Sequence, residues 1–166
     1  AVAHLLDRAA RSAPAAPLAE PEAVPVAYET VDWEPAEGGG LSDAIYEEYG
    51  LQTIRIDGAQ AHPTQLVQSA SMASIAPPKP SYRPMLPADI LGKLSEAQLE
   101  TVIYAGEAHT GFLAGAWTVD DTLDSLSAAP EEAEGAIRFR QGFMVGDGTG
   151  VGKGRESAAI ILDNWM

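Results

Sequence analysis

Glycines and a lysine alternate closely over residues 146–155 of this chain, in an order that could bind phosphate. The run Gly146-Asp147-Gly148-Thr149-Gly150-Val151-Gly152-Lys153-Gly154-Arg155 follows the apolar residues 142–145 and precedes the largely apolar stretch 157–162. Glycines let successive backbone N–H groups converge on an oxyanion, because no Cβ atom stands in the way. A helix N-terminus adds partial positive charge, and a lysine reaches the outer phosphates. The order strand, glycine loop, lysine and helix therefore predicts a P-loop; the alternative is a glycine-rich turn with a surface lysine.

The glycine spacing distinguishes between classes of nucleotide-binding loop. A dinucleotide-binding fingerprint that begins at Gly146 would need a glycine where the chain has Val151. Residues 147–153 instead have the form Asp-x-x-Gly-x-Gly-Lys, which resembles helicase-type motors. We therefore predict that Lys153 is the catalytic lysine and holds the β- and γ-phosphates of a nucleotide.

The residue after this lysine departs from the usual pattern. Gly154 stands where most P-loops have Ser or Thr, whose hydroxyl binds Mg²⁺. Neither Thr149 nor Ser157 is obviously placed to replace that hydroxyl. Either a water or another side chain fills the ligand position, or metal binding is weakened, so no metal ligand is assigned. Arg155 either adds positive charge at the phosphates or lies on the helix surface.

Gln98 is the second candidate for nucleotide contact. It lies early in a predicted helix with Ser95 as N-cap and Leu99, Val102 and Ile103 on the apolar face. A glutamine amide can donate to and accept from an adenine edge at once; the alternative is an ordinary surface glutamine. The predicted nucleotide-binding residues are Gln98, Asp147, Gly148, Thr149, Gly150, Val151, Gly152, Lys153, Gly154 and Arg155.

Other elements are expected to position these residues. The alternation of apolar and polar residues over 51–56 predicts a strand. Residues 62–76 are predicted to form a short helix, and the proline-rich segment 77–87 is predicted to be extended. The glycines over 106–115 indicate a loop or broken helix, and 137–140 and 142–145 are predicted strands. Glu107 and His109 have the wrong neighbours for a zinc site, and His62 is expected to make a structural bond in a loop.

Composition limits the classes of function. The net charge is −14, of which residues 1–50 contribute −8, so most of the surface would repel nucleic acid. The chain has no cysteine, hence no disulfide or thiolate metal site, and no apolar run long enough to span a membrane. We expect no membrane association and a cytoplasmic location.

The N-terminal quarter is predicted to lack a packed core. Residues 1–11 could form a short helix, and 12–40 combine five prolines with acidic residues and three consecutive glycines. Such a composition buries too little apolar surface to offset ordering entropy. We predict a mostly disordered acidic, Pro-rich linker over 1–44; the alternative is that Tyr28, Val31 and Trp33 dock as a short extended piece.

Several motifs together resemble one family. These are His62-Pro63, the segment Ser71-Met72-Ala73-Ser74-Ile75-Ala76-Pro77-Pro78, the helix start Leu94-Ser95 with Gln98-Leu99, and the loop ending Gly152-Lys153-Gly154-Arg155. Over residues 45–166 the chain is similar to the Strawberry notch family of helicase-like ATPases, and the Gly-Lys-Gly-Arg ending is specific to that family.

The resemblance implies a fold and a function. It implies an α/β fold in which residues 45–166 form the N-terminal portion of a RecA-like P-loop NTPase lobe. This portion would have an incomplete parallel sheet with flanking helices and would be truncated after the P-loop helix. It implies ATP and Mg²⁺ as cofactors and nucleic acid, DNA rather than RNA, as partner through other parts of the protein. Hydrolysis also needs an acidic motif and a second lobe, so the fragment alone is expected to be inactive. A non-hydrolysing scaffold with a vestigial P-loop is the alternative, and a P-loop kinase or transferase is disfavoured by Gly154.

Overall fold

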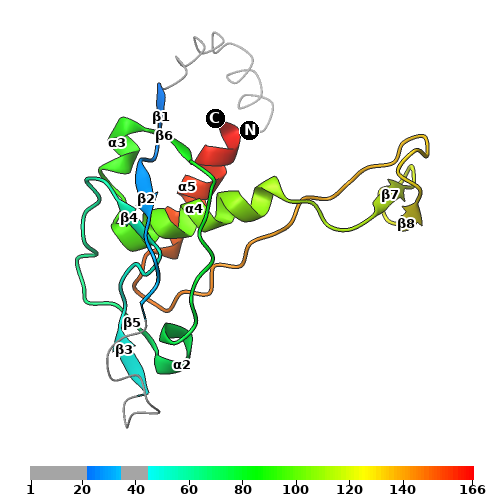
Figure 1. Cartoon of the computed structure of the whole chain (residues 1–166). Helices are drawn as coiled ribbons and strands as arrows, with labels where there is room; N and C mark the ends of the chain where they lie inside the picture. Colours follow the sequence, from blue (N-terminus) through cyan, green and yellow to red (C-terminus); the bar gives the residue numbers. More distant parts are fainter. Residues whose placement is uncertain (1–21, 35–44) are drawn as a thin grey trace, which may run out of the picture.

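A central helix, α4 (Glu96–Thr110), organises the structure (Figure 1). This computed structural model describes residues 22–34 and 45–166. The start of α4 is a capping box: the Ser95 hydroxyl accepts from the Gln98 backbone N–H, and Gln98 Oε1 accepts from the Ser95 N–H at 3.0 Å. Leu99, Val102 and Ile103 are buried, as the apolar pattern predicts.

The loop or broken helix predicted over 106–115 is confirmed only after Thr110 and is wrong for residues 106–110, which continue α4. Gly106 lies inside the helix against the ring of Tyr82, and a methyl group at this position would clash with the ring carbons. The ring thus occupies the space that a side chain would need. Close packing against this glycine outweighs its low helix propensity.

The second long helix, α5 (Lys153–Trp165), packs against α4 (Figure 1). Near its end, the buried carboxylate of Asp163 accepts bonds from the Tyr82 hydroxyl at 3.0 Å and the Met85 N–H at 2.7 Å. Asp163 therefore attaches α5 to the strand β6 (Met85–Pro87). Buried apolar residues around the two helices form the core: Val26, Tyr28, Ile54, Leu86, Leu94, Leu99, Val102, Ile103 and Ala159.

The described strands form four separate antiparallel pairs. Three of them are β1 (Ala23–Pro25) with β6, β2 (Tyr28–Thr30) with β4 (Ile54–Ile56), and β3 (Tyr46–Glu48) with β5 (Val67–Ser69). The fourth, β7 (Ala116–Val119) with β8 (Leu126–Ala129), lies apart. The fold is mixed α/β. No parallel sheet occurs within residues 22–34 and 45–166, where the parallel pairing is an isolated bridge between Gln60 and Ser95.

Several predicted elements differ from those observed. The strand expected over 51–56 is confirmed as the shorter β4, and the helix expected over 62–76 is reduced to β5 and the single-turn α2 (Ala70–Ala73). A second short helix is α3 (Ala88–Leu91). Residues 137–140 make only isolated bridges and 142–145 form no strand, so those predictions are wrong. A strand needs a neighbour for its backbone hydrogen bonds, and no described strand pairs with 142–145.

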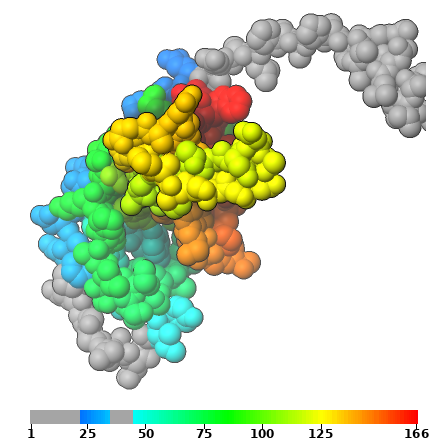
Figure 2. Space-filling model, turned by 90° about the vertical axis from the view of Figure 1, so that its right-hand side faces the viewer, coloured from blue at the N-terminus to red at the C-terminus, as the bar shows by residue number. Residues whose placement is uncertain are grey.

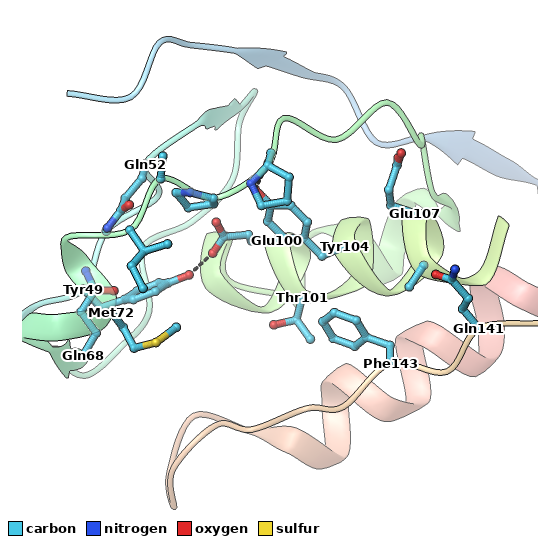
Figure 3. Close-up of a pocket in the computed structure, with 16 residues that line it drawn as sticks. Tyr49, Gln52, Gln68, Met72, Glu100, Thr101, Tyr104, Glu107, Gln141 and Phe143 are labelled. Carbon is cyan, nitrogen blue, oxygen red and sulfur yellow. Dashed lines mark hydrogen bonds between the residues drawn. The ribbon is translucent and has the colours of Figure 1, made fainter. Parts of the chain in front are cut away.

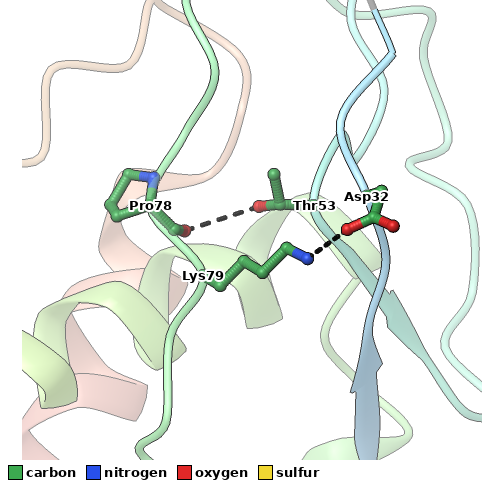
Figure 4. A network of polar contacts seen from close by, with 4 residues as sticks. All are labelled: Asp32, Thr53, Pro78 and Lys79. Atoms are coloured by element: carbon green, nitrogen blue, oxygen red, sulfur yellow. Dashed lines mark hydrogen bonds and ion pairs between the residues drawn. The ribbon is translucent and has the colours of Figure 1, made fainter.

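Residues 22–34 correct the linker prediction, because they form β1 and β2 and bury Val26 and Tyr28. The alternative, in which this segment docks as a short extended piece, describes residues 22–34 better. This segment has a partner elsewhere in the chain, because Lys79 forms an ion pair with Asp32 (Figure 4). The neighbouring Pro78 carbonyl accepts from the buried Thr53 hydroxyl at 3.5 Å. The predicted helix over 1–11 and the rest of the linker lie outside the described residues.

Residues 111–141 form an arm that contains β7 and β8 and stands away from the helices (Figure 1). Figure 2 looks onto the tip of this arm, which lies in front of the rest of the molecule. At its turn, Asp120 Oδ1 accepts bonds from the N–H groups of Asp124 and Ser125 at 3.0 and 3.3 Å. Asp120 therefore organises the turn, while the acidic residues 131–134 form a charged surface turn as predicted.

Candidate nucleotide-binding site

The glycine loop leads directly into α5. Gly150 and Gly152 have φ angles of 100° and 99°, which L-residues with side chains rarely adopt, and Gly152 is the N-cap of the helix. The exposed Lys153 folds back over the loop, and its Nζ donates to the carbonyls of Asp147 and Gly148, both at 2.8 Å. The ammonium group thus lies at the loop, where a phosphate would exchange for these carbonyls.

Two side chains from distant segments hold the middle of the loop. The Val151 carbonyl accepts from Gln98 Nε2 at 2.7 Å and faces His62 Nε2 at 3.2 Å. A carbonyl only accepts, so His62 donates to Val151 in the tautomer that carries a proton on Nε2. Its Nδ1 lies 2.9 Å from the Thr64 carbonyl oxygen and 3.2 Å from the Thr64 backbone nitrogen. His62 makes the structural bond that the sequence predicts, but its contact with the glycine loop was not foreseen.

Gln98 has a double role in the structure. Its side chain is only 3% exposed; Oε1 completes the capping box of α4 while Nε2 holds the loop. A primary amide has two N–H donors and two acceptor positions, so one of each is left. The contact is tight, since a Cβ atom at Gly152 would clash with Gln98 Nε2.

A pocket of about 520 Å³ lies beside the loop, and we call it the loop pocket. Of the predicted residues, Gln98, Gly150, Val151, Gly152 and Arg155 line it. The other predicted residues, Asp147, Gly148, Thr149, Lys153 and Gly154, continue the loop and the first turn of α5 outside this lining. Further lining residues are Gln60, Ala61, His62, Pro63, Thr64, Lys93, Leu94 and Ser95.

Sequence reasoning missed a buried acid behind the loop. Glu156, in the first turn of α5, is 0% exposed, and no N–H group of the described residues donates to its carboxylate oxygens. Burial raises the pKa of Glu156 to about 7, and the negative charge of the neighbouring Asp147 carboxylate and a hydrogen bond with that side chain add to this shift. The signal in the sequence was an acid three residues after the P-loop lysine, at a position facing the core.

A larger, mostly apolar cavity of about 650 Å³, here called the α4 pocket, lies along α4 (Figure 3). Phe143, from the segment predicted as a strand, lines it together with Met72 and Tyr104. Figure 3 shows the Tyr49 hydroxyl directed at the Glu100 carboxylate, to which it donates a hydrogen bond. Glu100 is 7% exposed, and burial, followed by the charge of Asp147, raises its pKa to about 7.

This raised pKa predicts a pH-dependent gain in stability for Glu100→Gln. A raised pKa in the folded state means that stability falls as pH rises from about 4.5 through 7, because the buried carboxyl must ionise. The full shift corresponds to roughly 3 kcal/mol, an upper limit because the Tyr49 bond favours the carboxylate. We expect Glu100→Gln to raise the unfolding midpoint at pH 8 but not at pH 4.5. Equal effects at both pH values, or a gain for the exposed control Glu131→Gln, would contradict the assignment.

The remaining titratable candidates have structural partners. The Glu107 carboxylate accepts the Ser81 and Tyr82 N–H groups at 2.8 and 2.7 Å, whereas His109 Nδ1 faces the Asn164 amide at 3.2 Å. Within residues 22–34 and 45–166, no three His, Asp or Glu side chains are grouped so as to hold a metal ion by themselves. Among the same residues, no helix has the length and apolar character to cross a membrane.

A glycine loop that ends in a lysine at the start of a helix, beside a pocket, defines a P-loop NTPase domain. In agreement, a family model described as "P-loop containing NTP hydrolase pore-1" matches residues 61–166. The chain is 34% identical over 123 residues to the protein strawberry notch homolog of Caenorhabditis elegans and 34% identical over 130 residues to protein strawberry notch of Drosophila melanogaster. It belongs to the Strawberry notch family.

The chain is also similar to a plant protein, FORGETTER 1 of Arabidopsis thaliana, with 32% identity over 129 residues. These three alignments cover 73% of this chain for both animal relatives and 76% for the plant relative. They cover only 5%, 6% and 8% of the relatives' own lengths, so the chain corresponds to a small part of each relative. No solved structure matches the chain.

Proposed function

We propose that this chain is the ATP-binding portion of a helicase-type NTPase that acts on nucleic acid, and on DNA rather than RNA. The observation that carries the proposal is the Val151 carbonyl held by both Gln98 and His62, which places the glycine loop between Lys153 and the loop pocket. Phosphates at the loop and a base in the pocket would then belong to one ligand. A cavity of about 520 Å³ is within the range of small-molecule sites.

Every predicted residue except Asp147 has a direct role in this proposal. Lys153 and Arg155 neutralise phosphate charge, while the backbone amides of 148–152 and of Gly154 face the phosphate oxygens at the N-terminus of α5. Gln98 retains one N–H donor and one acceptor position, which match the N6 and N7 groups of adenine. The proposal also includes a RecA-like parallel sheet for the whole domain. The acidic motif and the second lobe that hydrolysis needs would lie outside residues 1–166. This portion alone would then not hydrolyse ATP.

A magnesium ion fits the residues present. The buried Glu156 carboxyl group has the Asp147 side chain as its hydrogen-bond partner, and carboxylate oxygens together with nucleotide phosphates are typical magnesium ligands. Bound Mg²⁺ would neutralise charge on the β- and γ-phosphates. The residues of this chain would bind the nucleotide, orient its phosphates and close the loop around them.

Gln98→Glu tests the adenine assignment. Glutamate can still accept the Ser95 N–H and complete the capping box, but it cannot donate to adenine N7 or to the Val151 carbonyl. We expect the affinity of the full-length protein for ATP to fall about tenfold or more, the effect of losing hydrogen bonds worth at least 1.4 kcal/mol. Equilibrium titration with ATP and GTP, with helicity followed by circular dichroism, measures this; unchanged ATP affinity in the folded variant would refute the role of Gln98.

A further inference from the structure

His62 joins two parts of the chain that lie far apart in the sequence. It belongs to the segment 60–64, all five residues of which line the loop pocket. The Glu96 N–H donates to the Gln60 carbonyl at 2.8 Å and so attaches this segment to the start of α4. Two residues further on, His62 Nε2 lies 3.2 Å from the Val151 carbonyl. The half-buried His62 ring therefore connects one wall of the pocket, itself fixed to α4, to the glycine loop.

Thr64 fixes the orientation of the His62 ring. Three Thr64 atoms lie around Nδ1: the carbonyl oxygen at 2.9 Å, the hydroxyl oxygen at 3.0 Å and the backbone nitrogen at 3.2 Å. Because Thr64 surrounds this edge of the ring, Nε2 on the opposite edge is directed at the loop. With a proton on Nε2, His62 is a hydrogen-bond donor to Val151.

The two donors to the Val151 carbonyl set the orientation of the peptide unit between Val151 and Gly152. Gln98 Nε2 donates at 2.7 Å and His62 Nε2 at 3.2 Å, so both lone pairs of the oxygen have a partner. The described residues contain no cis peptide bond, and in a trans peptide the N–H points opposite to the C=O. Because the carbonyl is held by Gln98 and His62, the Gly152 N–H points away from both side chains.

The Gly152 N–H is free to meet a ligand. Within residues 22–34 and 45–166 it donates to no acceptor, and Gly152 provides no side-chain cap for the first N–H groups of α5. Phosphate oxygens commonly accept from such N–H groups at the start of a helix. Gly150 and Gly152, on either side of Val151, restrict the loop backbone little. The two side-chain bonds to Val151 therefore have to hold this peptide in one orientation.

We propose that His62 is a positioning residue of the nucleotide site, an inference that rests on the proposed nucleotide-binding function. By holding the Val151 carbonyl, His62 aims the Gly152 N–H at the phosphates of the nucleotide. His62 acts through the loop backbone, so its contribution concerns the phosphates and does not depend on the base. Gln98 differs in this respect, because its remaining donor and acceptor are assigned to adenine.

Two substitutions separate the contact of His62 with the loop from its contact with Thr64. The asparagine amide in His62→Asn can replace Nδ1 beside Thr64 but is too short to reach Val151. The longer side chain in His62→Gln brings an amide N–H to the place of Nε2. We expect His62→Asn to bind ATP about fivefold more weakly, the fold-change that corresponds to losing one hydrogen bond of about 1 kcal/mol. His62→Gln should bind ATP within about twofold of the wild-type protein.

Equilibrium titration of the full-length protein with a fluorescent ATP analogue, displaced by ATP or by inorganic tripolyphosphate, measures these effects. Tripolyphosphate has no base and should lose affinity for His62→Asn by the same factor as ATP. Circular dichroism checks that each variant is folded. Unchanged ATP affinity in His62→Asn would overturn the positioning role, and so would an equal loss in His62→Gln, which would place the effect in the packing of the ring. A loss confined to ATP would also overturn it, since His62 would then act on the base. No binding of ATP by the wild-type protein would overturn the proposed function itself.

Discussion

Replacing Lys153 with alanine is expected to abolish nucleotide hydrolysis by the full-length protein and to weaken ATP binding by at least tenfold. The ammonium group lies on the loop, where its two present partners are backbone carbonyls that a γ-phosphate would displace. Loss of one preorganised donor to transition-state charge lowers the rate constant by about 10²–10³-fold. The side chain is exposed, so its removal should cost little stability.

Steady-state phosphate release, measured alone and with single-stranded DNA or RNA, checks this prediction. Lys79→Ala is the matched control, because Lys79 is also exposed and its ion-pair partner is Asp32, away from the loop. The wild-type protein should hydrolyse ATP faster with DNA than with RNA, and Lys153→Ala should be inactive with both. Preserved turnover in Lys153→Ala would refute the P-loop assignment, whereas indifference to nucleic acid would refute only the proposed partner.

Gly152→Ala is expected to disrupt the loop through two separate effects. A φ angle of 99° is unfavourable for alanine by about 1–2 kcal/mol. In addition, the new Cβ would clash with Gln98 Nε2, and overpacking of this kind costs about 1–3 kcal/mol. Gln98 cannot simply move aside, because the same amide caps α4 and holds Val151. The variant should bind ATP at least tenfold more weakly.

Gly150→Ala provides the comparison that separates these effects. Gly150 has nearly the same φ angle, 100°, but a Cβ atom there would have nothing within 4 Å. Hydrogen exchange of the amides in 95–99 and 150–156 should accelerate strongly in Gly152→Ala, and in Gly150→Ala the change should be limited to the loop. If both variants behaved alike at 95–99, the contact between Gln98 and the loop would not matter to the start of α4.

Local sequence patterns were sufficient where the physics is local. Ser95 and Gln98 are three residues apart, so their capping box can be read directly from the chain. Gly150 and Gly152 adopt the left-handed backbone that their lack of a side chain permits. The strand expected over 142–145 failed for the opposite reason, since a strand is stable only with a neighbour that local patterns do not identify.

Local residue patterns were therefore enough to predict the lysine-ended glycine loop, the cap of α4 and the family resemblance, which the comparisons confirm. The surroundings of the loop depend instead on contacts between distant segments. His62 reaches Val151 across 89 residues of sequence, and Glu156 becomes a buried acid beside Asp147. The pKa shifts, the loop pocket and the order of residues 22–34 all depend on contacts between distant segments. Their free energies come from burial and pairing in the folded chain, so no local pattern encodes them.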